Sequence, residues 1–130
     1  MKFMVCYDDS NVAADALKIA VQHAEAFNAK VYVVTSIKGG PDVPRKVFVR
    51  AEKDLKQVKE QIEDQGIECE TRVSVRGLEP GEDLVQFAKD QNIEEMFVGV
   101  KRRSKVGKLV FGSTAQYVIL EAPCPVHTVK

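Results

Sequence analysis

Segments typical of strands and segments typical of helices alternate along the whole 130-residue chain. Short apolar or alternating runs predict strands at residues 2–7, 30–37, 67–75, 94–100 and 125–129. Apolar residues spaced by three and four predict helices at 11–27, 47–62 and 113–121, with a further helix beginning at Pro80. This alternation implies a parallel sheet with right-handed crossovers and helices on both faces. The sequence therefore predicts one α/β domain over residues 1–130.

Local signals set several of the predicted boundaries. Ser10 is placed to cap the first helix, and Gly66 to end the second. Pro80 suits the first turn of the third helix, whose inner face carries Leu84, Val85, Phe87 and Ala88. The strand at 67–75 alternates strictly, with Glu68, Glu70, Arg72 and Ser74 on its polar side. One solvated face predicts that this strand lies at an edge of the sheet.

Composition excludes several classes of function. The 19 basic residues balance 19 acidic ones, so bulk charge gives no support for nucleic-acid binding. No apolar run approaches the roughly 20 residues that a membrane span needs, and the N-terminal segment does not resemble a signal peptide. The three cysteines lie far apart in apolar or strand-like segments, which predicts reduced packing residues in a cytoplasmic protein. His23 and His127 have no partner at metal-site spacing, so no metal centre is expected.

The segment VGVKRRSKVGKLVFGST, residues 98–114, combines glycines with five basic side chains and leads into a helix. It is no Walker A loop, because no hydroxyl residue follows Lys108 and no glycine stands five positions before Gly107. The dinucleotide fingerprint G-x-G-x-x-G is absent after every predicted strand. A phosphate-accepting receiver domain would need a carboxylate at the end of the third strand, where this chain has SVRG.

Three motifs together resemble the universal stress protein family. ATP-binding members carry G-x2-G-x9-G-[ST] after the fourth strand, and Gly99, Gly112 and Ser113 keep that spacing. The opening MVCYDDS resembles the family's first strand, which ends in an aspartate, a small residue and a serine. APCPVHTV resembles the family's signature before the last strand, and the order of elements agrees over all 130 residues.

The resemblance implies a fold and a ligand. The fold is a five-stranded parallel sheet sandwiched by four helices, Rossmann-like and of the adenine nucleotide alpha hydrolase type, with strand order 3-2-1-4-5. The expected ligand is ATP, either alone or bound together with Mg²⁺. Asp8 would lie near the adenine and ribose, and Ser36 or Ile37 would contact the base through the backbone. The phosphates would be wrapped by the loop, which assigns them to the following residues: Gly99, Arg102, Gly112, Ser113 and Thr114.

Arg102 stands where the motif has its middle glycine. A side chain there would obstruct the site if the loop needs a positive φ or a close approach of backbone to ligand. A guanidinium can instead bind phosphate through two parallel hydrogen bonds. The basic run that contains Arg102 has two corresponding interpretations, an anion-binding loop before a helix N-terminus or a solvated turn.

Two further residues of the expected site have a purely structural alternative. STAQ, residues 113–116, fits a capping box in which Ser113 caps the helix and Gln116 reaches back. Asp8 and Asp9 could equally cap the first helix. As a pair they could also hold Mg²⁺ beside phosphates.

No catalytic residue is indicated, so at most slow ATP hydrolysis is expected. The first hypothesis is a nucleotide-binding sensor or switch in the stress response. The second is a nucleotide-free interaction module that works through partner docking. Relatives commonly dimerise through the last strand, which maps to Val126 to Val129, and a homodimer is expected under both hypotheses.

Overall fold

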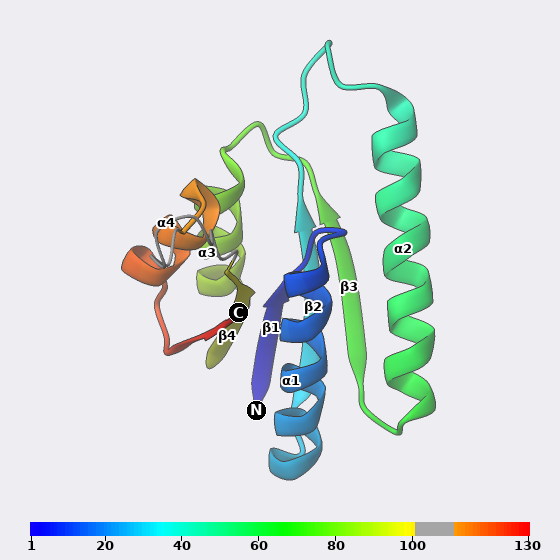
Figure 1. Cartoon of the computed structure of the whole chain (residues 1–130), viewed down its shortest axis with the longest axis vertical. Helices are drawn as coiled ribbons and strands as arrows, with labels where there is room; N and C mark the ends of the chain where they lie inside the picture. Colours follow the sequence, from blue (N-terminus) through cyan, green and yellow to red (C-terminus); the bar gives the residue numbers. More distant parts are fainter. Residues whose placement is uncertain (101–110) are drawn as a thin grey trace.

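A computed structural model describes residues 1–100 and 111–130, and within them strands and helices alternate as predicted (Figure 1). The elements follow the order β1 (Lys2–Cys6), α1 (Asn11–Phe27), β2 (Lys30–Ser36), α2 (Arg45–Asp64), β3 (Cys69–Ser74), α3 (Pro80–Asp90), β4 (Glu95–Gly99), α4 (Ser113–Glu121) and β5 (Val126–Val129).

The strands form a parallel sheet in the order β3-β2-β1-β4-β5, which confirms the expected topology. Strand β1 pairs with β2 through Val5 and Val33 and with β4 through Val5 and Phe97. The chain therefore builds the sheet outward from β1 in one direction and then crosses over to β4 on its other side. This reversal leaves a crevice at the carboxyl ends of β1 and β4, the place where open α/β sheets bind ligands.

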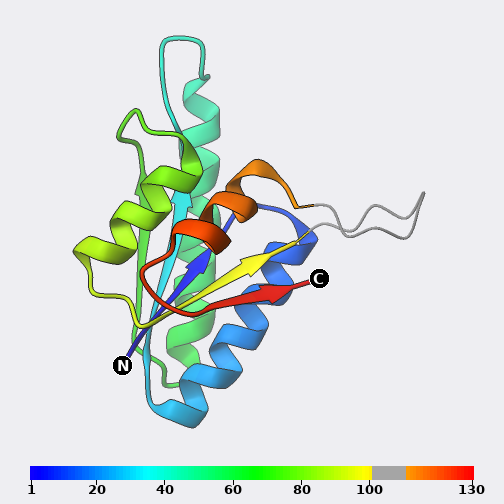
Figure 2. The same ribbon diagram turned by 90° about the vertical axis from the view of Figure 1, so that its left-hand side faces the viewer.

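Helices cover both faces of the sheet, as Figures 1 and 2 show. Helices α1 and α2 pack on one face in a core that contains Phe3, Val5 and Phe97. Helices α3 and α4 pack on the other around Met4, Met96 and Val118. Strand β1 is buried on both faces, which explains its unbroken apolar sequence. Each fully buried aliphatic or aromatic side chain contributes about 1.5–3 kcal/mol to this arrangement.

The predicted helix boundaries hold at their capping residues. The side chain of Ser10 accepts a hydrogen bond from the backbone of Ala13 at 3.2 Å, as an N-cap should. Gly66, just beyond the end of α2, has φ +80°, a conformation that favours glycine. Pro80 occupies the first turn of α3. These three signals acted locally, so the sequence was enough to place them.

Strand β3 lies at the sheet edge as predicted, but its polar side is not uniformly solvated. Ser74 is buried, because its side of the sheet is the one that α3 covers. The strand ends at Ser74, one residue before its predicted end, and Val75 is exposed. Helix α2 begins at Arg45, directly after Pro44. Within the described parts of the chain, no helix is both long and apolar enough for a membrane crossing.

Candidate functional site

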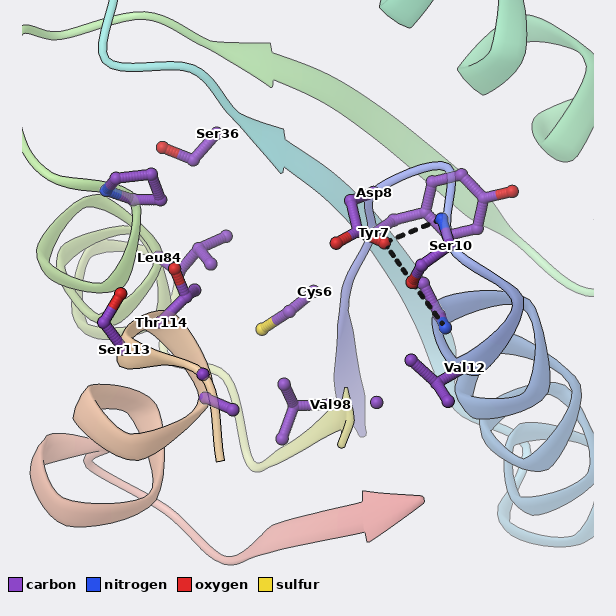
Figure 3. Close-up of a pocket in the computed structure, with 15 residues that line it drawn as sticks. Cys6, Tyr7, Asp8, Ser10, Val12, Ser36, Leu84, Val98, Ser113 and Thr114 are labelled. Carbon is purple, nitrogen blue, oxygen red and sulfur yellow. Dashed lines mark hydrogen bonds between the residues drawn. The ribbon is translucent and has the colours of Figure 1, made fainter. Parts of the chain in front are cut away.

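A pocket of about 350 Å³ opens at the carboxyl ends of β1 and β4, where the order of the strands reverses (Figure 3). This volume lies in the range of small-ligand sites. Its floor is formed by Cys6, Val98 and Gly99, and one wall by the loop from Tyr7 into α1. The rest of its lining comes from β2, α3 and α4: Ser36, Pro80, Leu84, Gly112, Ser113, Thr114 and Ala115.

Six of the eight predicted site residues line this one pocket: Asp8, Ser36, Gly99, Gly112, Ser113 and Thr114. Ile37 instead lines a neighbouring cavity of about 330 Å³, and its backbone N–H donates to the carbonyl of Ser74 at 2.9 Å. Arg102 and the other basic residues of the loop lie outside the described residues. Sequence reasoning therefore brought together residues from four separate segments of the chain.

The start of α4 forms the polar wall of the pocket. Gly112 is the N-cap residue, and Ser113 is the first residue of the helix. The predicted capping box is therefore wrong, since a capping serine would have to stand one position earlier. Gly112 has no side chain to satisfy the first turn, and the first N–H groups of a helix lack acceptors within the helix. These groups and the helix dipole make this end of the pocket suited to an anion.

Asp8 lies on the opposite wall and is held by Ser10. Its Oδ1 accepts hydrogen bonds from the backbone N–H of Ser10, at 2.9 Å, and from the Ser10 hydroxyl. Ser10 in turn caps α1, so neither Asp8 nor Asp9 is the cap. The second carboxylate oxygen of Asp8 is turned toward the pocket (Figure 3). Asp8 thus presents a fixed hydrogen-bond acceptor to a ligand.

Close packing against α1 requires glycine at position 99, and the sequence motif alone did not reveal this requirement. A Cβ atom at this position would lie 2.6 Å from the backbone carbon and oxygen of Val12 and 2.9 Å from the nitrogen of Ala13. The absent side chain therefore lets the end of β4 touch the start of α1. Gly112 is different, because a Cβ there would meet no atom within 4 Å among the described residues. Of the two glycines, Gly112 is the one that leaves open space beside the pocket.

Cys6 and Tyr7 give the pocket a partly apolar interior. Burial raises the pKa of the Cys6 thiol from 9.0 to about 12, with smaller contributions from Cys124 and Asp8. Burial also raises the pKa of the Tyr7 phenol, helped by the carboxylates of Asp54, Asp8 and Asp9. Both groups are thus neutral at physiological pH. Cys6 is no activated nucleophile, because reactive cysteines have a lowered pKa.

The described residues that line the pocket include neither histidine nor lysine, and none of them indicates a step of acid–base or nucleophilic catalysis. Among residues 1–100 and 111–130, no group of three or more His, Cys, Asp or Glu is placed to hold a metal ion. A divalent cation in this pocket would therefore need oxygen ligands from the bound molecule, as Mg²⁺ commonly takes from phosphates. The geometry describes a binding site for a small polar anion with an apolar portion.

The model of the universal stress protein family matches residues 1–130, the full length of the sequence. The chain belongs to this family. This universal stress protein is similar to a solved universal stress protein from Archaeoglobus fulgidus, with 36% identity and a TM-score of 0.90 over 100% of this chain and 98% of the other. It is also similar to an Archaeoglobus fulgidus universal stress protein solved in complex with dAMP, with 32% identity and a TM-score of 0.85. That second similarity covers 100% of this chain and 98% of the other.

A curated relative gives the same result at the level of sequence. A universal stress protein of Thermus aquaticus is 30% identical over 133 residues, covering 98% of this chain and 96% of the relative. The resemblance of the three motifs is therefore confirmed at the level of the family.

Sequence reasoning missed an ion pair beside the pocket of this universal stress protein. Asp83, in the first turns of α3, is only 1% exposed. It forms the ion pair with Arg76 and also accepts a hydrogen bond from the hydroxyl of Ser36. One signal was available: Asp83 precedes Phe87 by four residues and so shares the inner face of α3. Its partners were not readable, because Ser36 is 47 residues away in the chain.

Proposed function

We propose that this universal stress protein binds an adenine nucleotide, with ATP as its ligand, in the pocket between β1 and β4. The observation that carries the proposal is the placement of Asp8 and the start of α4 on opposite walls of one ligand-sized pocket. A carboxylate suits ribose hydroxyls, and a helix N-terminus suits phosphates. The dAMP complex of the Archaeoglobus fulgidus relative supports the same ligand class.

The phosphates are assigned to the start of α4. Backbone N–H groups from Gly112 to Thr114 offer donors there, and Ser113 adds a hydroxyl that is not used as a cap. Arg102 is proposed as a further phosphate ligand on the sequence alone, because a guanidinium forms charge-assisted bonds to phosphate. Mg²⁺, when present, would be bound by phosphate oxygens and water rather than by a protein cage.

The base and ribose are assigned to the other end of the pocket. Asp8 accepts from the ribose hydroxyls through the carboxylate oxygen that faces the pocket. Ser36 lies at the end of β2 and contacts the base, while Leu84 and Pro80 supply apolar surface. Ile37 stays a weaker candidate, because its backbone N–H is already bonded to Ser74.

In this proposal the protein is a cytoplasmic sensor or switch of the stress response, active as a homodimer. Among the described residues at the proposed phosphate end (Gly112, Ser113, Thr114 and Ala115) none is a general base, so binding rather than turnover is the functional event in this proposal, and hydrolysis is slow at most. Nucleotide contacts α4, and α4 connects directly to β5, the edge strand proposed for dimerisation. In this proposal, a change in nucleotide occupancy alters the dimer interface through α4 alone.

The test is direct measurement of bound nucleotide. The purified protein is denatured, and released compounds are identified by absorbance and mass spectrometry. Titration calorimetry of the nucleotide-free protein with ATP, with and without Mg²⁺, then gives the affinity. Asp8→Asn is expected to lower the affinity for ATP about tenfold, because one good hydrogen bond to a charged group is lost.

Asp9→Asn is the matched control. Asp9 is adjacent in sequence, yet it does not line the pocket and its carboxylate lies 3.7 Å from Arg50. ATP affinity should be unchanged in this variant. Arg102→Gly is expected to weaken ATP binding, and tighter binding would show instead that the arginine obstructs the site. Absence of any nucleotide binding in the wild-type protein would overturn the proposal and favour the nucleotide-free interaction module.

A further inference from the structure

A buried carboxylate stands directly behind one residue of the pocket wall. Asp83 is 1% exposed, and its Oδ2 accepts a hydrogen bond from the Ser36 hydroxyl at 2.5 Å. Its Oδ1 accepts from Nε of Arg76 at 2.6 Å. Arg76 also donates to the backbone carbonyl of Asp83 at 3.0 Å. The three side chains join the end of β2, the segment after β3 and the start of α3.

The ion pair determines where the Ser36 proton points. Arginine is always protonated, and a carboxylate paired with it offers acceptors only. A hydroxyl has one hydrogen to donate, so the hydrogen of Ser36 is committed to Asp83. What Ser36 can still offer to a molecule in the pocket is the lone pairs of its oxygen. Ser36 is therefore an acceptor toward the pocket and not a donor.

This polarity distinguishes purine bases from one another. Adenine carries an amino group at position 6, which is a donor, whereas guanine and hypoxanthine carry an oxygen there, which is an acceptor. In the view of Figure 3, Leu84 lies between Ser36 and the start of α4, the proposed phosphate end, and Ser36 is therefore assigned to the base end of a bound nucleotide. An acceptor at that end favours the amino group and opposes the oxygen.

We propose that Ser36, with its hydroxyl oriented by Asp83, selects 6-amino purines over 6-oxo purines in this pocket. Ser36 is the specificity-determining residue, and Asp83 and Arg76 are positioning residues that act through it. The inference rests on the proposed nucleotide function and deepens it, since it names the chemical group by which the base is recognised. Sites that use a hydrogen bond to a ligand polar group reject analogues that lack the matching group.

The experiment compares ATP with inosine triphosphate, which has an oxygen in place of the 6-amino group. Affinities of both nucleotides are measured by titration calorimetry on the nucleotide-free, full-length protein. The wild type is expected to bind ATP about tenfold more tightly, which corresponds to one hydrogen bond of ordinary strength. In Ser36→Ala, ATP weakens and the ratio of the two affinities falls close to one.

Three further variants separate specificity from a general loss of structure. Ser36→Thr keeps a hydroxyl and should keep the preference for ATP. Asp83→Asn can donate a hydrogen bond to Ser36 and free its proton, so the preference should shrink even where ATP is still bound. Thr35→Val is the matched control: it removes the neighbouring hydroxyl, which donates to the Tyr7 carbonyl at 2.8 Å and does not line this pocket. The ratio should be unchanged there.

The outcomes are distinguishable. Equal affinities for the two triphosphates in the wild type, or an undiminished preference in Ser36→Ala, would overturn the role of Ser36 and leave nucleotide binding standing. Failure of both triphosphates to bind would overturn the proposed function and this inference together. If Asp83→Asn does not fold, the proposal is still tested, because Ser36→Ala and Ser36→Thr decide it without that variant.

Discussion

Gly99 and Gly112 belong to the same motif, but they differ in what surrounds the missing side chain. A Cβ at position 99 would overlap the backbone of Val12, which cannot move without shifting α1. Gly99→Ala is therefore expected to cost about 1–3 kcal/mol of unfolding free energy, the usual cost of overpacking. Urea denaturation followed by circular dichroism measures it.

Gly112→Ser is the matched control for that substitution. Its Cβ meets no atom within 4 Å in the described structure, and its φ of −66° and ψ of 162° suit a capping serine. Stability should be unchanged or slightly raised. If Gly99→Ala proved as stable as the wild type, the close contact between β4 and α1 would be contradicted.

Cys6 lines the pocket but is expected to be chemically inert. Its pKa is raised by burial from 9.0 to about 12, so at pH 8 its thiolate fraction is about three orders of magnitude below that of a free cysteine. Reaction of the native protein with an aromatic disulfide reagent should modify half-buried Cys124 first and Cys6 only after addition of urea. Rapid labelling of Cys6 in a Cys124→Ser variant would contradict this.

The same shift has a consequence for stability against pH. The folded state holds the Cys6 proton more tightly than the unfolded state does. This contribution is fully present below about pH 9 and is lost as the pH rises toward 12. Urea midpoints measured from pH 7 to pH 10.5 should fall with rising pH less steeply in Cys6→Ala than in the wild type.

At the scale of elements, the two serines that were candidates for helix capping have different roles. Ser10 caps α1 through its bond to Ala13, whereas Ser113 lies inside the first turn of α4 and makes no capping bond within the described residues. Ser10→Ala is expected to cost about 1 kcal/mol of stability. Ser113→Ala should change the free energy of unfolding by less than about 0.5 kcal/mol and should lower the affinity for ATP. Chemical denaturation of both variants checks the pair, and equal losses would contradict the assignment.

The elements show why sequence was sufficient for most of the fold and for part of the site. Signals such as the cap at Ser10 and the positive φ at Gly66 act within a few residues, so each could be found locally. Gly99, Gly112 and Ser113 followed from a motif with a fixed spacing, whereas Asp8 and Ser36 were assigned through the family resemblance. The burial of Ser74 and the bond between Ser36 and Asp83 depend on where α3 lies over the sheet, and no local pattern encodes that placement.

At the scale of the whole molecule, the order of the described strands puts the pocket and the β5 edge of the sheet on the same half of the structure. The crevice lies between β1 and β4, and β5 is the strand next to β4. Helix α4 touches the pocket at its first residues and leads into β5 at its end. An edge strand presents unpaired backbone groups that pair readily with another chain. Dimerisation through β5 would therefore place two nucleotide pockets close to one shared interface.

The outer edge of β5 can be blocked without disturbing its inner edge. The carbonyl of Pro125, just before β5, accepts a hydrogen bond from the backbone N–H of Met96 in β4 at 3.0 Å, and the carbonyl of Val129 accepts one from the N–H of Val100, just after β4, at 2.7 Å. Because backbone groups alternate along a strand, the N–H of exposed Thr128 points away from β4. Thr128→Pro removes only that outward donor, and proline is tolerated at an edge position. Light scattering coupled to size exclusion should show a dimer for the wild type and for the control Thr128→Val, but a folded monomer for Thr128→Pro. A proline variant that remained dimeric would move the interface away from β5, and a monomeric wild type would remove the dimer from the proposed switch altogether.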